Sequence, residues 1–113
     1  MEKRSLARIQ PFIARCVITW AQHRLVAYIT DLSLGGVQVA CDDAPPPTDA
    51  DVILEARFDP RAEPTRLTAR VRWGKPSKRG HTCGLTFEGL GPQEESILQA
   101  VIERILRQAD RLS

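Results

Sequence analysis

The residues best suited to chemistry in this chain form two groups that are separate in sequence. The first is a basic N-terminal segment, in which Arg4 and Arg8 have the spacing R-x-x-x-R and Lys3 precedes them. The second, at residues 31–36, has the pattern D-x-S-x-x-G and supplies a carboxylate, a hydroxyl and two adjacent glycines. One group therefore offers cations, and the other offers hydrogen-bond acceptors and accessible backbone amides.

These two groups complement each other as a split site for an anionic guanine nucleotide. A guanidinium group is a planar fork that holds a phosphate bidentately or binds the O6/N7 edge of guanine. Asp31 is a suitable acceptor for the N1–H and N2–H donors of guanine, which adenine does not present in that arrangement. Ser33 and the amides near Gly35 and Gly36 can satisfy phosphate or base edges, because glycine leaves room for a close approach.

Each group also has a simpler interpretation. The D-x-S-x-x-G pattern occurs once, but Asp and Ser followed by two glycines also make an ordinary turn between two strands. The R-x-x-x-R spacing alone indicates a solvated face, because it recurs at Arg57/Arg61, Arg66/Arg70 and Arg107/Arg111. The copy at residues 4 and 8 differs because it precedes the first strand and is the only copy followed by the D-x-S-x-x-G pattern.

The composition is that of one globular domain. The chain has 113 residues, of which 42% are hydrophobic and 27% charged, and its net charge of +2 is too small for a protein that coats nucleic acid. Cys16, Cys41 and Cys83 lack C-x-x-C spacing, so we expect small buried thiols in a reducing compartment. No segment approaches the ~18 consecutive apolar residues of a membrane span, so we expect a cytoplasmic protein without membrane insertion.

Short apolar runs between residues 12 and 88 predict six strands of an all-β barrel or sandwich. The clearest is Arg66–Trp73, in which every second residue from Leu67 onward is apolar. This phase places Trp73 in the core. The other strands are expected at 12–20, 25–30, 37–41, 52–58 and 82–88, with a turn at 21–24 and loops at 42–51, which contains three prolines, and 75–80.

The end of the chain predicts an amphipathic helix at about residues 92–111. Pro92 is tolerated at the first helical position, and Glu94 and Glu95 lie near the positive end of the helix dipole. We expect the apolar face to close one end of the barrel, and the alternative is a helix reserved for a partner. That face consists of Ile97, Leu98, Val101, Ile102, Ile105, Leu106 and Ala109.

Taken in order, these features resemble the PilZ family, whose members sense the bacterial second messenger cyclic di-GMP. The resemblance rests on a basic residue before the R-x-x-x-R spacing, the D-L-S-x-G-G turn, the Trp73-Gly74 pair, the Gly84-Leu85-x-Phe87 strand and the terminal helix. It implies an all-β fold with a terminal helix, namely a six-stranded antiparallel β-barrel plus a C-terminal α-helix at residues 12–113. A flexible ligand-binding arm at residues 1–11 would precede the barrel.

The resemblance also implies the ligand, cyclic di-GMP, bound as a monomer or an intercalated dimer. Lys3 stands where many members carry another arginine, and lysine is a point charge without the stacking plane. For Trp73 the resemblance implies a position at the barrel rim beside the nucleotide, whereas the strand phase implies the core. The residues expected to bind the ligand are Lys3, Arg4, Arg8, Asp31, Ser33, Gly35, Gly36 and Trp73.

We therefore expect a monomeric, non-catalytic receptor that changes conformation on binding and signals to a downstream protein, for example in motility or biofilm control. We expect no cofactor or metal, because His81 and Cys83 supply too few ligands for structural zinc and the sequence has no Walker or Rossmann glycine pattern. One alternative is a ligand-independent interaction adaptor of the same fold. Another is an oligonucleotide-binding barrel, although aromatic residues make up only 5% of the chain.

Overall fold

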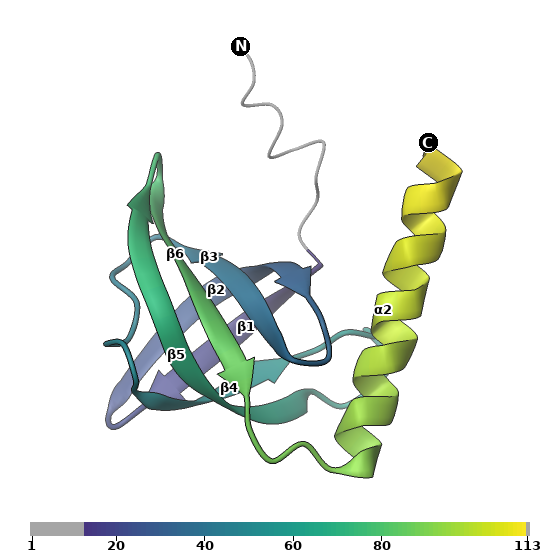
Figure 1. The fold of residues 1–113 in the computed structure, drawn as a ribbon, viewed down its shortest axis with the longest axis horizontal. Helices are drawn as coiled ribbons and strands as arrows, with labels where there is room; N and C mark the ends of the chain where they lie inside the picture. Colours follow the sequence, from purple (N-terminus) through teal and green to yellow (C-terminus); the bar gives the residue numbers. More distant parts are fainter. Residues whose placement is uncertain (1–12, 113) are drawn as a thin grey trace.

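The structure is a computed structural model that describes residues 13–112, with side chains described to residue 108. Six antiparallel strands form a closed barrel in the order β1-β2-β3-β6-β5-β4, followed by helix α2 (Figure 1). The predicted barrel with a C-terminal helix is confirmed. The elements are β1 (Ala14–Trp20), β2 (His23–Leu32), β3 (Gly36–Cys41), β4 (Asp51–Ala56), β5 (Thr65–Ser77), β6 (Gly80–Phe87) and α2 (Pro92–Leu112).

The core is built from alternate residues of the strands. In β4, Val52, Leu54 and Ala56 are buried while the residues between them are exposed, because successive side chains of a strand point to opposite faces. The same period of two runs through most of the barrel. The largest fully buried side chains are Ile18, Ile29, Leu54, Leu67, Leu98, Val39, Val71, Cys16 and Cys83.

The three cysteines are part of this core, as the sequence predicts. Cys16, Cys41 and Cys83 are buried free thiols. Burial raises the pKa of Cys16 and of Cys83 to about 12 and also raises the pKa of Cys41. The thiols therefore stay protonated at neutral pH and pack as small apolar groups.

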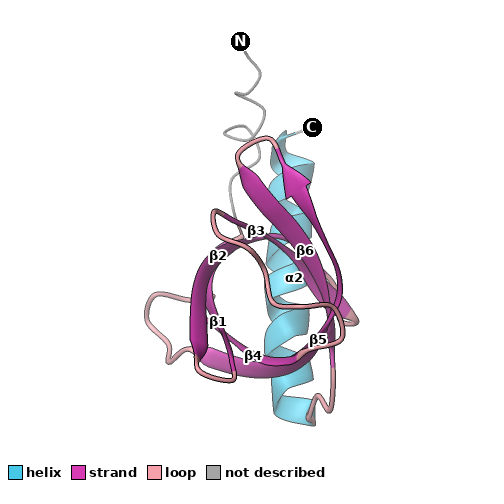
Figure 2. Cartoon of the chain, turned by 90° about the vertical axis from the view of Figure 1, so that its left-hand side faces the viewer, coloured by secondary structure: helices cyan, strands magenta, loops and turns pink. Residues whose placement is uncertain are grey.

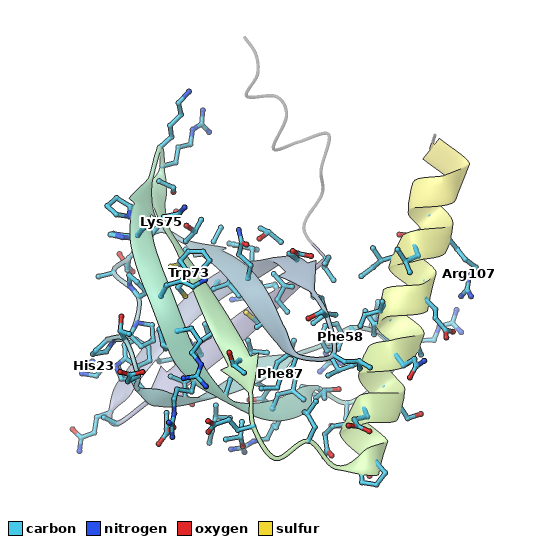
Figure 3. All side chains as sticks on the ribbon, viewed as in Figure 1. His23, Phe58, Trp73, Lys75, Phe87 and Arg107 are labelled. Atoms are coloured by element: carbon cyan, nitrogen blue, oxygen red, sulfur yellow. The ribbon has the colours of Figure 1, made fainter. Side chains whose placement is uncertain are left out.

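Helix α2 closes one end of the barrel. Its first turn is capped by Glu94, whose Oε1 accepts a hydrogen bond of 2.9 Å from the Gly91 N–H. Leu98 and Val101 complete the barrel core, and Arg104 Nη2 donates to the Phe58 carbonyl oxygen at 3.0 Å. Figure 2 shows the ring of strands with α2 behind it, and Figure 3 places the Phe58 side chain near the helix. The expected closing role is confirmed for this part of α2.

The proline-rich segment 42–50 covers the opposite end of the barrel (Figure 2). Pro46 is buried, and Pro45 packs so closely on Gly74 that a Cβ there would lie 3.1 Å from its Cγ. The Asp49 N–H donates to the Val71 carbonyl oxygen at 2.8 Å, which fastens the segment to β5. The predicted loop is therefore present and anchored, and β4 begins at its last expected residue, Asp51.

The predicted loop at 75–80 is wrong. Strands β5 and β6 continue through it as a two-stranded ribbon, with Lys75 paired to Thr82 and a turn at residues 78–79. Pro76 fits because β4 pairs with β5 only as far as Arg70 and the segment before β4 bonds to Val71, so that no described strand flanks this side of β5 at Pro76 and proline is tolerated there. The turn predicted at 21–24 is also shorter and comprises residues 21–22.

Across residues 13–112, no helix combines the length and the apolar character that crossing a bilayer requires.

Two leucines of α2 provide a test of how the helix is held. Leu98 is fully buried, so Leu98→Ala removes core contacts and should lower the free energy of unfolding by about 2–5 kcal/mol. Leu106 is 59% exposed, so Leu106→Ala should change it by less than about 0.5 kcal/mol. Urea unfolding followed by circular dichroism measures both, and equal losses would contradict the packing described here.

Candidate functional site

A β-bulge in β2 turns Asp31 to the outside of the barrel. Ile29 pairs with Val39 and Asp31 pairs with Gln38, so Thr30 is an extra residue in the ladder. Strict alternation would point Asp31 inward like Ile29, but a one-residue shift moves the following side chains to the other face. Asp31 is consequently exposed on the outer surface.

A second bulge in β5 does the same for Trp73. Val71 pairs with Leu85 and Trp73 pairs with Gly84, which leaves Arg72 as the extra residue. Trp73 is 38% exposed and lies on the outer surface. The core position that the strand phase predicts for it is therefore wrong. The reason is physical: strict alternation holds from Leu67 to Val71 and ends at the bulge.

The two bulges lie at opposite sides of a shared row of residues. Asp31 pairs with Gln38, Gln38 with Gly84, and Gly84 with Trp73, across β2, β3, β6 and β5. Three strand spacings separate the backbones at the two ends of this row by roughly 14 Å. The outer surface between them carries a hollow of about 300 Å³, lined by Asp31, Leu32, Ser33, Gly36, Val37, Gln38, Arg72, Trp73, Gly84, Leu85 and Thr86.

The hollow thus brings together Asp31, Ser33, Gly36 and Trp73 among the residues singled out from the sequence. Gly35 lies in the turn that follows Ser33, and its carbonyl oxygen accepts a hydrogen bond of 3.0 Å from the Phe87 N–H. The predicted residues Lys3, Arg4 and Arg8 lie outside the described part of the chain.

Hydrogen bonds within the D-x-S-x-x-G segment set the shape of this edge of the hollow. Ser33 Oγ accepts hydrogen bonds from the N–H groups of Gly35 at 3.2 Å and Gly36 at 3.3 Å. The Ser33 N–H also donates to the Gly36 carbonyl oxygen at 2.9 Å. Beside the turn, Asp31 Oδ1 accepts from the Leu32 N–H at 2.9 Å, which orients the carboxylate. Ser33 therefore makes the hydrogen bonds expected of an ordinary turn between two strands. The same turn forms one edge of the hollow.

Two glycines make close packing possible at the hollow. A Cβ on Gly36 would lie 2.3 Å from the Leu85 carbonyl oxygen, so the turn approaches the backbone of β6 more closely than any side chain allows. A Cβ on Gly84 would lie 2.3 Å from Trp73 Nε1, so the indole occupies the space above this residue. Figure 3 shows Trp73 and Lys75 along β5, and Lys75 Nζ lies 5.4 Å from the centroid of the Trp73 ring.

Sequence reasoning missed three polar residues of the hollow: Gln38, Arg72 and Thr86. Arg72 Nε donates to Thr86 Oγ1 at 3.1 Å, a bond that joins β5 to β6. In the sequence Arg72 belongs to the polar phase of its strand, which predicts a solvated face. Its only local distinction is that it directly precedes Trp73.

Within the part of the chain that the structure describes, no cluster of three or more His, Cys, Asp or Glu side chains has an arrangement that could hold a metal ion.

The two glycines of the turn offer a matched pair of substitutions. Gly36→Ala should lower the free energy of unfolding by about 1–3 kcal/mol, because the new Cβ overlaps the Leu85 carbonyl oxygen. Gly35→Ala should have a small effect, because its Cβ would meet only Ser33 Oγ at 3.8 Å. Urea unfolding distinguishes them, and a Gly36→Ala protein as stable as Gly35→Ala would contradict the close approach.

Gly84→Ala should push the Trp73 indole out of its place, since the Cβ and the ring cannot occupy the same space. In a Trp20→Phe background, where Trp73 is the remaining tryptophan, we expect a red-shifted emission and stronger quenching by iodide. Unchanged emission and quenching would show that the indole does not lie over residue 84.

Comparison with known proteins identifies the fold. The PilZ domain model matches residues 2–104. YcgR from Escherichia coli in complex with c-di-GMP has a TM-score of 0.72 and 19% identity over 87% of this chain and 43% of its own. The PilZ domain of YcgR with c-di-GMP, also from Escherichia coli, has a TM-score of 0.70 and 18% identity over 87% and 86% of the two chains.

The Bacillus subtilis inhibitor of motility, MotI/DgrA, has a TM-score of 0.67 and 18% identity over 87% of this chain and 48% of its own. The chain therefore spans less than half the length of YcgR and of MotI/DgrA. No curated protein sequence matches it. The family match covers most of the chain, and the solved structures share its fold. The chain belongs to the PilZ domain family.

Proposed function

We propose that this protein is a non-catalytic receptor for cyclic di-GMP. The observation that carries the proposal is the hollow in which two bulges bring Asp31 and Trp73 to the same outer surface as Ser33 and Gly36. Asp31, Ser33 and Gly36 come from the motif that predicted a guanine nucleotide, and Trp73 comes from a different strand, β5. A barrel that needed only a stable core would gain nothing from turning the Trp73 indole outward on the same face as Asp31.

The chemistry of the hollow suits a guanine base. The Asp31 carboxylate supplies acceptors for the N1–H and N2–H groups of guanine. Trp73 supplies an exposed aromatic ring at the other end of the row. The turn at residues 33–36 lies beside the carboxylate and gives a ligand close access to the backbone.

The phosphates of the ligand require cations, and we assign them to a ligand-binding arm at residues 1–11, with Lys3, Arg4 and Arg8 as contacts. The path of the chain supports this assignment. The Ile13 N–H donates to the Ile29 carbonyl oxygen at 2.8 Å, two residues before Asp31. Arg8 is five positions before Ile13, and five residues span at most roughly 17 Å, so its side chain can reach the hollow.

The solved relatives support the class of ligand and suggest the process. Both Escherichia coli structures contain c-di-GMP, and the Bacillus subtilis protein is named an inhibitor of motility. In our proposal, binding joins the arm to the barrel through charge-assisted hydrogen bonds and changes the surface offered to a downstream protein, with motility or biofilm control as the process.

Isothermal titration calorimetry of the full chain with cyclic di-GMP tests the proposal. Asp31→Ala and Arg8→Ala should each weaken binding at least tenfold, or about 1.4 kcal/mol, because each removes a group that pairs with the ligand. Arg66→Ala is the matched control for the arginine, since Arg66 is exposed on β5 and does not line the hollow, and it should bind as the wild type does. Absence of binding by the wild type would favour the ligand-independent adaptor.

A further inference from the structure

We infer that Arg72 is a specificity-determining residue of this site, which binds the O6/N7 edge of a guanine base held in the hollow. This inference rests on the proposed function and adds a contact that neither motif contains. Of the described residues lining the hollow, Arg72 is the one with a cationic side chain and Asp31 the one with a carboxylate.

Arg72 follows the buried Val71 and points to the outer face by strand alternation, and the bulge brings Trp73 to the same face beside it. As the extra residue of β5, Arg72 has no partner of its own in the β6 ladder, and it directly precedes Trp73. Its Nε donates to Thr86 Oγ1, which holds the guanidinium against β6 at the lining of the hollow. Bulges commonly redirect a side chain toward a functional site.

A comparison with Arg70, two residues earlier on β5, shows what distinguishes Arg72. Arg70 Nε lies 3.1 Å from Asp51 Oδ1 and 3.4 Å from Glu88 Oε2, so its charge is balanced by carboxylates. Arg72 forms no ion pair with any carboxylate among residues 13–108, and its hydrogen bond goes to a neutral hydroxyl. The positive charge of Arg72 thus faces the hollow without a described counter-charge.

The arrangement matches the two edges of one guanine. Asp31 and Arg72 stand on opposite sides of the hollow, on β2 and β5, with β3 and β6 between them. A base whose N1–H and N2–H groups donate to Asp31 presents O6 and N7 as the acceptors still to be satisfied. Because the bond to Thr86 uses Nε, the terminal amino groups of Arg72 supply the planar fork that this edge accepts.

Calorimetry with cyclic di-GMP on four full-length proteins tests the inference: wild type, Arg72→Ala, Arg72→Lys and the control Arg66→Ala. Arg72→Ala should bind at least tenfold more weakly, and Arg72→Lys should recover little of the loss, because an ammonium lacks the bidentate fork. Arg66→Ala should bind within twofold of the wild type.

Each other outcome has a definite meaning. Wild-type affinity in Arg72→Ala would overturn the role of Arg72 while leaving the receptor function intact. Full recovery of affinity by Arg72→Lys would overturn the base contact in favour of a phosphate contact, because lysine binds phosphate as a point charge. Absence of binding by the wild type would instead reject the proposed function itself. Urea unfolding of Arg72→Ala should match the wild type, because the side chain is exposed.

Discussion

The site depends on the two one-residue bulges in the barrel wall. The side chains of a strand point alternately to its two faces, so every second residue of these strands lies in the core. The next residue in that series can reach the outer surface only if the pairing register shifts by one residue. The extra residues Thr30 and Arg72 provide that shift. Without them, the Asp31 carboxylate would point into an apolar core, at a cost of several kcal/mol for a buried charge without a partner. In each of these strands, alternate residues before the bulge fill the core and the residue directly after it lines the hollow.

The remaining parts of the fold keep this hollow in shape. Helix α2 closes one end of the barrel through Leu98 and Val101, and the anchored segment 42–50 covers the other, so the strands beneath the hollow belong to a packed core. Gly36 and Gly84 then allow the turn and the Trp73 indole to lie against β6. The lining of the hollow thus includes both glycines together with polar side chains.

Periodicity was sufficient to predict the strands and the helix, because each buried face repeats along the sequence as it does in β4. It left a barrel or a sandwich open, and the resemblance to the PilZ family predicted the barrel. Periodicity failed for Trp73, because a bulge is decided by pairing with the neighbouring strand and leaves no trace in the alternation of one strand. The predicted loop at 75–80 failed for a similar reason, since pairing with β6 outweighed Pro76. Asp31, Ser33 and Gly36 were found through a local motif, whereas Gln38, Arg72 and Thr86 come from three strands and meet only in the folded barrel.

The central claim is that the bulge-built hollow is where cyclic di-GMP binds. The most direct test is a titration of the ¹⁵N-labelled full chain with cyclic di-GMP, followed by NMR, because the two tryptophans report on different places. Trp73 lines the hollow, and Trp20 pairs with His23 at the far end of the β1–β2 hairpin. The account predicts that the Trp73 indole N–H and the amides of Asp31, Gln38 and Gly84 shift together while the Trp20 indole N–H stays in place. Shifts at Trp20 without shifts at Trp73, or no shifts at either indole, would contradict it.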